Sequence, residues 1–253
     1  MKKITVLLLL FVVVPLSAQV QRFYYKYKYV PDSTNREEVK EDMMLLDIDK
    51  AGSKYYSYDM FKIDSLANVD LQQQLKSGSG NISINKKLKP GTVSYSVTKT
   101  YPDYQVFLHT SISSDKYVVA EEQKPDWKIF SDKQKIGEWN TQKAETDFGG
   151  RHWIAWFSTE IPFQDGPYKF YGLPGLIVKV EDITGSHIMT LEGSKTMETV
   201  EKTSEEVELP AGAVSIGFNK KEIEATKAQF KKAWKSYKSD PAKNMRQMMM
   251  SAG

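Results

Sequence analysis

The stretch from Gly150 to Asp182 reads GRHWIAWFSTEIPFQDGPYKFYGLPGLIVKVED, and it carries the strongest structural signals of this chain. Large apolar side chains alternate along its first part, with Trp153 and Phe157 on one side and Trp156 on the other. A period of two residues is typical of a β-strand. Because both sides of this strand are apolar, we expect both to be covered.

Two turns follow within the same stretch. Residues 165–167 spell Asp-Gly-Pro, and residues 173–176 place Pro174 and Gly175 at the two central positions. Proline fixes φ near −65° and glycine accepts a positive φ, so the second sequence predicts a type II turn. Gly172, just before it, predicts a close approach of another part of the backbone.

The second turn lies within residues 172–177, which spell GLPGLI. The chain resembles the GLPGLI family of exported proteins from Bacteroidetes-type bacteria. The motif residues are Gly172, Leu173, Pro174, Gly175, Leu176 and Ile177. The flanking matches are Gly150-Arg151, Trp153, residues 155–157, Ile161-Pro162 and residues 166–170. The resemblance implies export from the cytoplasm. It implies no particular reaction, because no activity is established for the family.

Outward from the motif, the same alternation recurs along most of the chain and predicts a series of short strands. Gly149-Gly150 predicts a hairpin turn before the motif strand. The expected strands cover residues 23–29, 44–48, 55–58, 93–98, 106–110, 117–120, 151–157, 176–181 and 187–192, with weaker signals at 127–130 and 136–139. Short strands in quick succession favour antiparallel pairing.

The period changes near the C-terminus. Asn219 with Glu222 has the spacing of a capping box, and apolar residues then recur at helical intervals. These are Ile223, Phe230, Trp234 and Tyr237, and Asp240-Pro241 predicts the start of a second helical stretch. We therefore expect a β-rich α+β fold: a mostly antiparallel open or half-barrel sheet with a C-terminal helix docked on it.

The N-terminus predicts a cleavable signal peptide. Lys2 and Lys3 precede an apolar run over residues 4–16, and the small residues Ser17 and Ala18 follow. The run is shorter than the roughly 20 residues that span a bilayer. The expected organisation is a signal peptide over residues 1–18, a β-rich domain over 19–218 and a helical segment over 219–253. We expect an exported protein, periplasmic or secreted, with no transmembrane segment after cleavage.

Composition excludes several classes of protein. The chain of 253 residues has no cysteine, so disulfides, thiol nucleophiles and thiolate metal sites are ruled out. Its formal charge is +3, with 35 basic and 32 acidic residues. This balance is not that of a nucleic-acid-binding protein or of a polybasic membrane-binding protein.

No motif predicts nucleophilic or metal-dependent catalysis. The sequence lacks G-x-S-x-G, and Ser79 lies in a Gly/Ser-rich stretch that predicts a linker. The histidines, His109, His152 and His187, fall in different expected strands and outside an H-E-x-x-H motif. Structural roles for them are therefore expected. We expect no metal and no cofactor, and we assign no catalytic residue.

Weaker chemical signals have ordinary alternatives. The first residues of a calcium loop are mimicked by Asp47, Asp49 and Gly52, but Tyr58 stands where a bidentate Glu is needed, so a turn is expected. Methionines near the C-terminus favour a helix edge over Cu(I) binding. The carboxylates Glu160, Asp165, Glu181 and Asp182 can pair as in a glycosidase.

The remaining hypothesis is a binding surface. Aromatic side chains and an arginine are the residue types that dominate binding energy at interfaces. The candidates are Arg151, Trp153, Trp156, Tyr168, Phe170 and Tyr171. We expect a non-enzymatic periplasmic or cell-envelope binding protein that holds an envelope protein, a peptide or a small apolar ligand on the concave face of its sheet. The alternative is a secreted hydrolase with an acid and histidine site near residues 151–182.

Overall fold

The computed structural model describes residues 19–63, 65–66, 91–198 and 222–241. The expected signal peptide, the linker containing Ser79, the cap at Asn219 and the C-terminal methionines lie outside these residues. Within the described part of the chain, no helix is long and apolar enough to cross a membrane.

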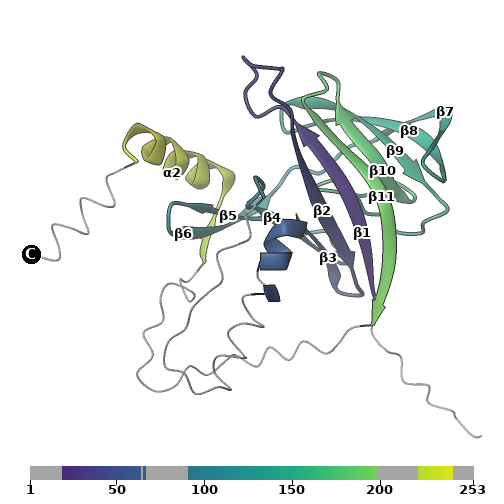
Figure 1. Cartoon of the computed structure of the whole chain (residues 1–253), viewed down its shortest axis with the longest axis horizontal. Coiled ribbons are helices and arrows are strands. Elements are labelled where there is room, and N and C mark those ends of the chain that lie inside the picture. The colour runs from purple at the N-terminus through teal and green to yellow at the C-terminus, as the bar shows by residue number, and fades with distance from the viewer. Residues whose placement is uncertain (1–18, 64, 67–90, 199–221, 242–253) are drawn as a thin grey trace, which may run out of the picture.

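The strands form one twelve-stranded sheet with the order β12-β6-β5-β4-β3-β2-β1-β11-β10-β9-β8-β7 (Figure 1). All its pairings are antiparallel except that of β12 with β6. The strands are β1 (Gln19–Tyr29), β2 (Lys40–Ile48), β3 (Gly52–Ser57), β4 (Ser96–Thr100), β5 (Val106–Ile112), β6 (Asp115–Glu121), β7 (Lys128–Ile136), β8 (Trp139–Phe148), β9 (Arg151–Ser158), β10 (Leu176–Asp182), β11 (His187–Glu198) and β12 (Ile223–Ala225). The predicted β-rich α+β fold is confirmed.

Alternation along β1 decides which face of the sheet is the inner one. Phe23, Tyr25 and Tyr27 are buried, whereas Lys26 and Lys28 point to the other side and pair with Glu192 and Glu41. Because successive side chains of a strand point to opposite faces, every strand paired to β1 continues the same two faces. One face is therefore the core, and we call the opposite one the outer face.

The sheet is strongly curled around residues 159–175, the connection between β9 and β10. Lys99 of β4 and Phe148 of β8 are seven strand steps apart, which is about 34 Å across a flat sheet. Yet Lys99 Nζ lies 3.4 Å from the Phe170 carbonyl, and the ring of Phe148 lies 5.5 Å from that of Phe170. The sheet is therefore a half-barrel, and we call residues 159–175 the inner segment because they fill it.

Strand boundaries differ from the prediction mainly between residues 136 and 148. Residues 136–139 do not form a strand of their own: Ile136 ends β7, Trp139 begins β8, and Gly137 turns between them with φ +58°. The polar strand β8 was not predicted, because only Thr141, Ala144, Thr146 and Phe148 along it are buried. The Gly149-Gly150 hairpin turn is confirmed, with φ of +60° and +78°.

The C-terminal helix begins later than predicted. Ile223 lies in β12, and α2 runs over Lys227–Ser239 with Thr226 as its N-cap. Thr226 and Gln229 bond reciprocally, so the capping box lies about two helical turns beyond the expected residues. Asp240 is the C-cap of the helix, and the second helical stretch predicted after it lies outside the described residues. The helix lies at the β6 edge of the molecule, where Phe230 packs on Tyr117 (Figure 1).

Candidate functional site

The inner segment is held by a buried ion pair. Lys99 Nζ and Asp165 Oδ1 are 2.7 Å apart, and both side chains are fully buried. The ammonium also donates to the carbonyls of Gly166 and Tyr168, at 2.8 and 3.0 Å. Burial lowers the pKa of Lys99, and the Asp165 carboxylate opposes that effect. A buried charge is tolerated only when paired and hydrogen-bonded in this way, so the pair fixes the inner segment to β4.

Further hydrogen bonds hold the inner segment and the start of β10. Trp127 Nε1 donates to the Tyr171 carbonyl at 2.8 Å, and the Tyr25 hydroxyl donates to the carbonyl of Ile177 in β10 at 2.7 Å. The Tyr101 hydroxyl donates to the second oxygen of Asp165, and burial is the main reason that the pKa of Tyr101 is raised. The inner segment is thus bonded to the residue after β4 and to the segment before β7, and β1 is bonded to β10 just beyond the inner segment.

The six predicted binding residues do not form one surface. Phe170 is fully buried and contacts the rings of Trp153, Phe148, Trp127 and Tyr168. Trp153 and Tyr171 are buried with it, and Tyr168 is partly buried against the same core. These residues build the core, so the expectation that the concave face of the sheet holds a ligand is corrected: that face is occupied by the chain itself.

The other two candidates lie apart. Trp156 is half-buried on the outer face of β9, opposite to Trp153. Arg151 is exposed at the start of the same strand, where Nη1 donates to Asp182 at 2.8 Å. Burial of Asp182 favours its neutral form, but hydrogen bonds from Thr184, the His187 N–H and Arg151 lower its pKa overall. Arg151 therefore serves to neutralise a buried carboxylate.

The GLPGLI turn is tighter than predicted. Gly175 donates its N–H to the Leu173 carbonyl at 2.8 Å, which closes a three-residue turn around Pro174. In a type II turn Leu176 would bond to Leu173, but its N–H donates to Ile161 instead. Gly175 has φ +154°, and a Cβ there would lie 2.2 Å from the Ser158 carbonyl oxygen. The close approach occurs at Gly175, whereas Gly172 has φ +91° and open space around it.

The acids and histidines of residues 151–187 do not converge. His152 bonds to Asp147 at 2.9 Å on the outer face, whereas His187 bonds to the Tyr27 hydroxyl at 2.8 Å on the inner face. Glu160 accepts from Asn140, and Glu181 pairs with Lys179. Among the residues that the structure describes, no group of three His, Asp or Glu side chains has the geometry of a metal site.

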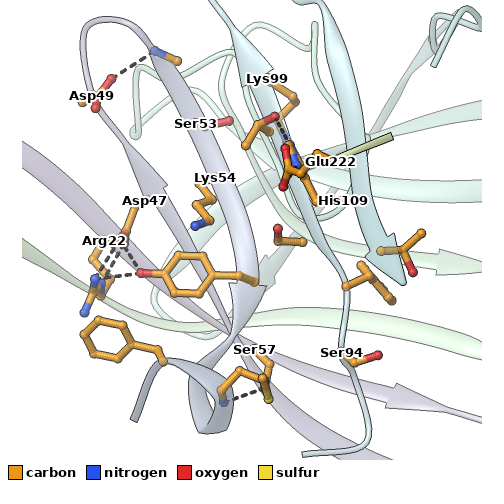
Figure 2. A pocket seen from close by; sticks show the side chains of 18 of the residues that line it. Arg22, Asp47, Asp49, Ser53, Lys54, Ser57, Ser94, Lys99, His109 and Glu222 are labelled. Carbon is orange, nitrogen blue, oxygen red and sulfur yellow. Dashed lines mark hydrogen bonds and ion pairs between the residues drawn. The ribbon is translucent and has the colours of Figure 1, made fainter. Parts of the chain in front are cut away.

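A large hollow lies on the outer face. It has a volume of about 1020 Å³ and extends across β1 to β6, beside the helical residues 58–63 (Figure 2). We call it the outer trough. Its lining mixes charged and hydroxyl side chains with aromatic rings, among them Arg22, Lys54, Tyr56, Phe61, Thr98 and His109.

One side of the outer trough carries a rigid charge cluster. Arg22 donates to both carboxylate oxygens of Asp47 at 2.7 Å, and the Tyr56 hydroxyl also donates to Asp47. The Arg22 guanidinium lies 4.6 Å from the ring centre of Phe61. The hydrogen bond to Asp47 raises the pKa of Arg22, while burial raises the pKa of Tyr56. The bidentate pair holds these groups in one orientation.

The opposite side carries a second pair of polar groups. His109 Nδ1 lies 3.8 Å from Glu222, and Nε2 shares a hydrogen bond of 2.9 Å with Thr98. Lys54 lies between this pair and the Arg22–Asp47 cluster (Figure 2). Its ammonium lies 5.2 Å from the Tyr56 ring centre and has no carboxylate partner among the described residues. The trough thus presents the Lys54 ammonium between the Arg22–Asp47 ion pair and the polar side chains of His109 and Glu222.

The supposed calcium loop is a turn, as predicted. Asp49 Oδ1 accepts the N–H groups of Ala51 and Gly52, at 2.8 and 3.0 Å, and Asp47 is bound to Arg22.

Two sets of important residues were not predicted. Lys99 has a signal in the sequence, because it continues the buried alternation of Tyr95 and Val97 where an apolar residue is expected. Its partner Asp165 was considered only as a catalytic carboxylate. The trough residues Arg22, Lys54 and Thr98 have no such signal, since each one occupies an ordinary polar position of its strand.

Comparison with known proteins supports the fold and leaves the activity open. A family model described as "Protein of unknown function (Porph_ging)" matches residues 98–179, from just before Lys99 to just after the GLPGLI turn. The chain therefore contains a domain of unknown function, while the GLPGLI assignment stays a resemblance. No curated protein matches the chain.

Solved structures of PNGF-II share the fold. Its C2 and P21 crystal structures superpose with TM-scores of 0.52 and 0.51, each at 12% sequence identity. Each alignment covers 85% of this chain, and 32% and 33% of the PNGF-II chains respectively. This chain thus spans about a third of the length of those proteins. At such low identity the likeness concerns the fold alone.

Proposed function

We propose that this chain is an exported, non-enzymatic binding protein of the cell envelope, and that the outer trough holds a peptide segment of its partner. Export is supported by the basic, apolar and small-residue order of residues 1–18. A direct check is the N-terminal sequence of the protein purified from its host envelope. Gln19 as the first residue supports export, and a retained Met1 contradicts it.

The outer trough itself is the observation that carries the binding proposal. With about 1020 Å³ it matches the upper end of the range for small-molecule pockets, but it is open along several strands instead of enclosed. An open hollow suits an extended chain, of which only one side needs to be covered. Arg22 and Asp47 are already fixed by each other, so binding does not have to order them.

The position of Lys54 indicates which peptides bind. Its ammonium has no carboxylate partner among the described residues and lies over the ring of Tyr56, which packs in turn on Phe61. An acidic side chain next to an apolar one would pair with Lys54 and cover these rings. We therefore expect the bound segment to contain a carboxylate beside an aliphatic or aromatic residue.

A displayed random-peptide library selected against the protein tests the proposal. Selected peptides should bind at least tenfold more weakly to a Lys54→Glu variant, because the charge reversal repels their carboxylate. Lys128→Glu is the matched control, since Lys128 is an exposed lysine on β7, outside the trough lining. Peptides that bind both variants equally well, or a library that yields no binder, would contradict the proposal.

A further inference from the structure

The helix α2 carries a surface that the outer trough does not use. Five of its thirteen residues are lysine and none is acidic. Among the described residues, Lys231, Lys232 and Lys235 have no carboxylate partner, whereas Lys227 pairs with Glu121. A chain that is almost neutral overall therefore concentrates positive charge on one short element.

The helix is oriented by contacts on its other side. Phe230, Ala233 and Tyr237 are its partly buried residues and lie on one face, because their spacing is three and four residues. Phe230 packs against Tyr117 of β6, with ring centres 5.5 Å apart. Lys227 reaches Glu121, which also binds Lys169 of the inner segment at 2.9 Å. The helix is thus attached to the body of the protein with its lysines facing outward.

A tryptophan accompanies the lysines. Trp234 has an exposed fraction of 40%, stacks on Tyr237 at 5.9 Å, and lies under the Lys238 ammonium at 5.4 Å. Tryptophan and tyrosine favour the boundary between water and lipid, where the ring is sheltered and its polar atom stays hydrated. A helix with a basic face bordered by such rings is typical of a segment that lies on a membrane surface.

From these contacts we infer that the outward face of α2 binds the surface of an anionic lipid bilayer. Lysine is depleted in the cores of protein–protein interfaces, and the exposed apolar part of this face is a single indole. An anionic bilayer needs no shape complementarity and is attracted by each lysine separately. The position of α2 at one extremity of the molecule allows such contact without hindrance from the sheet (Figure 1).

Vesicle co-sedimentation tests the inference. The protein used runs from Gln19 to Gly253, because the apolar residues 4–16 would themselves bind lipid. One set of vesicles is pure phosphatidylcholine, and the other contains phosphatidylglycerol in addition. We expect binding to the anionic vesicles only, weakening as salt is raised, because mobile ions screen the attraction.

Substitutions locate the contact. The double variant Lys231→Gln/Lys235→Gln should bind anionic vesicles at least tenfold more weakly, since each lysine near such a surface contributes on the order of fivefold. Lys133→Gln/Lys135→Gln removes the same charge from the exposed strand β7 and should bind as the wild type does. Trp234→Ala should weaken binding without unfolding the protein, because this side chain is exposed.

Three results would overturn the inference: no binding to anionic vesicles at low salt, equal binding to neutral ones, or equal weakening by the two double variants. Binding to soluble polyglutamate without binding to vesicles would point to an acidic protein partner and would also overturn it. The outcome is independent of the outer trough, because Lys54→Glu leaves α2 unchanged.

Discussion

The inner and outer faces of the sheet both carry pairs of basic and acidic side chains, but the two pairs have different roles. On the inner face, Lys99 and Asp165 are fully buried and form an ion pair, and Lys99 also donates to backbone carbonyls. Their charges are therefore neutralised within the fold. On the outer face, Arg22 and Asp47 are also paired, but they border an open trough that leaves Lys54 without a carboxylate. Enclosure decides whether a charge stabilises the chain or is available to a ligand.

The comparison also changes the meaning of the GLPGLI motif. Its turn, the aromatic residues before it and Asp165 build the inner segment that fills the half-barrel. Residues of this kind resemble a binding surface in the sequence because interfaces and cores both use aromatic side chains. Their burial indicates that the motif specifies the fold of this chain, while the polar side chains of the outer face are not used to fill the half-barrel.

The largest expected effect comes from breaking the inner ion pair. Asp165→Asn leaves the Lys99 ammonium buried without its counter-charge, and we expect the free energy of unfolding to fall by about 3–5 kcal/mol. Asp47→Asn is the outer-face counterpart, and its loss should be about 1–2 kcal/mol because water reaches that pair. Urea unfolding measures both.

A further variant separates pairing from packing at this position. Lys99→Met/Asp165→Leu removes both charges and should recover part of the stability lost in Asp165→Asn, because no buried charge is then left unpaired. The recovery should be incomplete, since the Gly166 and Tyr168 carbonyls and the Tyr101 hydroxyl lose their partners. Equal losses in Asp165→Asn and Asp47→Asn would show that the enclosure of the inner pair has no energetic consequence.

A smaller effect is expected within the motif turn. Gly175→Ala should cost about 2–3 kcal/mol, because the added Cβ meets the Ser158 carbonyl in a backbone conformation that L-residues rarely adopt. Gly172→Ala adds its Cβ into open space and should cost about 1–2 kcal/mol, from the left-handed φ alone. Thermal unfolding of the two variants gives the comparison, and a greater loss in Gly172→Ala would contradict it.

The smallest effect concerns pH. Burial lowers the pKa of His187, with the Arg151 cation acting in the same direction. The unfolded chain therefore binds this proton more readily, so the stability contributed by neutral His187 is present above its ordinary pKa of about 6.5 and is lost as the pH falls below it. Because the ring is only half-buried, we expect a loss of a few tenths of a kcal/mol.

His152 is expected to show the opposite dependence of stability on pH. The hydrogen bond to Asp147 raises the pKa of His152, so its contribution is present at acidic pH and is lost as the pH rises. Urea unfolding at pH 7 and pH 5 should show that wild type loses stability relative to His187→Gln on acidification. A pH dependence that is identical in the two proteins would exclude this role of His187.

The sequence by itself determined the local features of this protein. Alternation along residues 23–29 and 151–157 fixed strands and their buried faces, because a period of two is a property of the extended backbone. Helical spacing placed Phe230, Trp234 and Tyr237 together, although it set the start of the helix about two turns too early. The glycines of the predicted turns, Gly149, Gly150 and Gly175, adopt the positive φ that few other residues accept.

Only the tertiary structure decided which face was filled and by what. The pairing of Lys99 with Asp165 and the meeting of Arg22 with Asp47 depend on strand order and on the curl of the sheet. Arg22 and Glu222, which lie near the two ends of the described chain, both line the trough. Contacts between residues so far apart follow from the path of the whole chain, and local periodicity carries no information about that path.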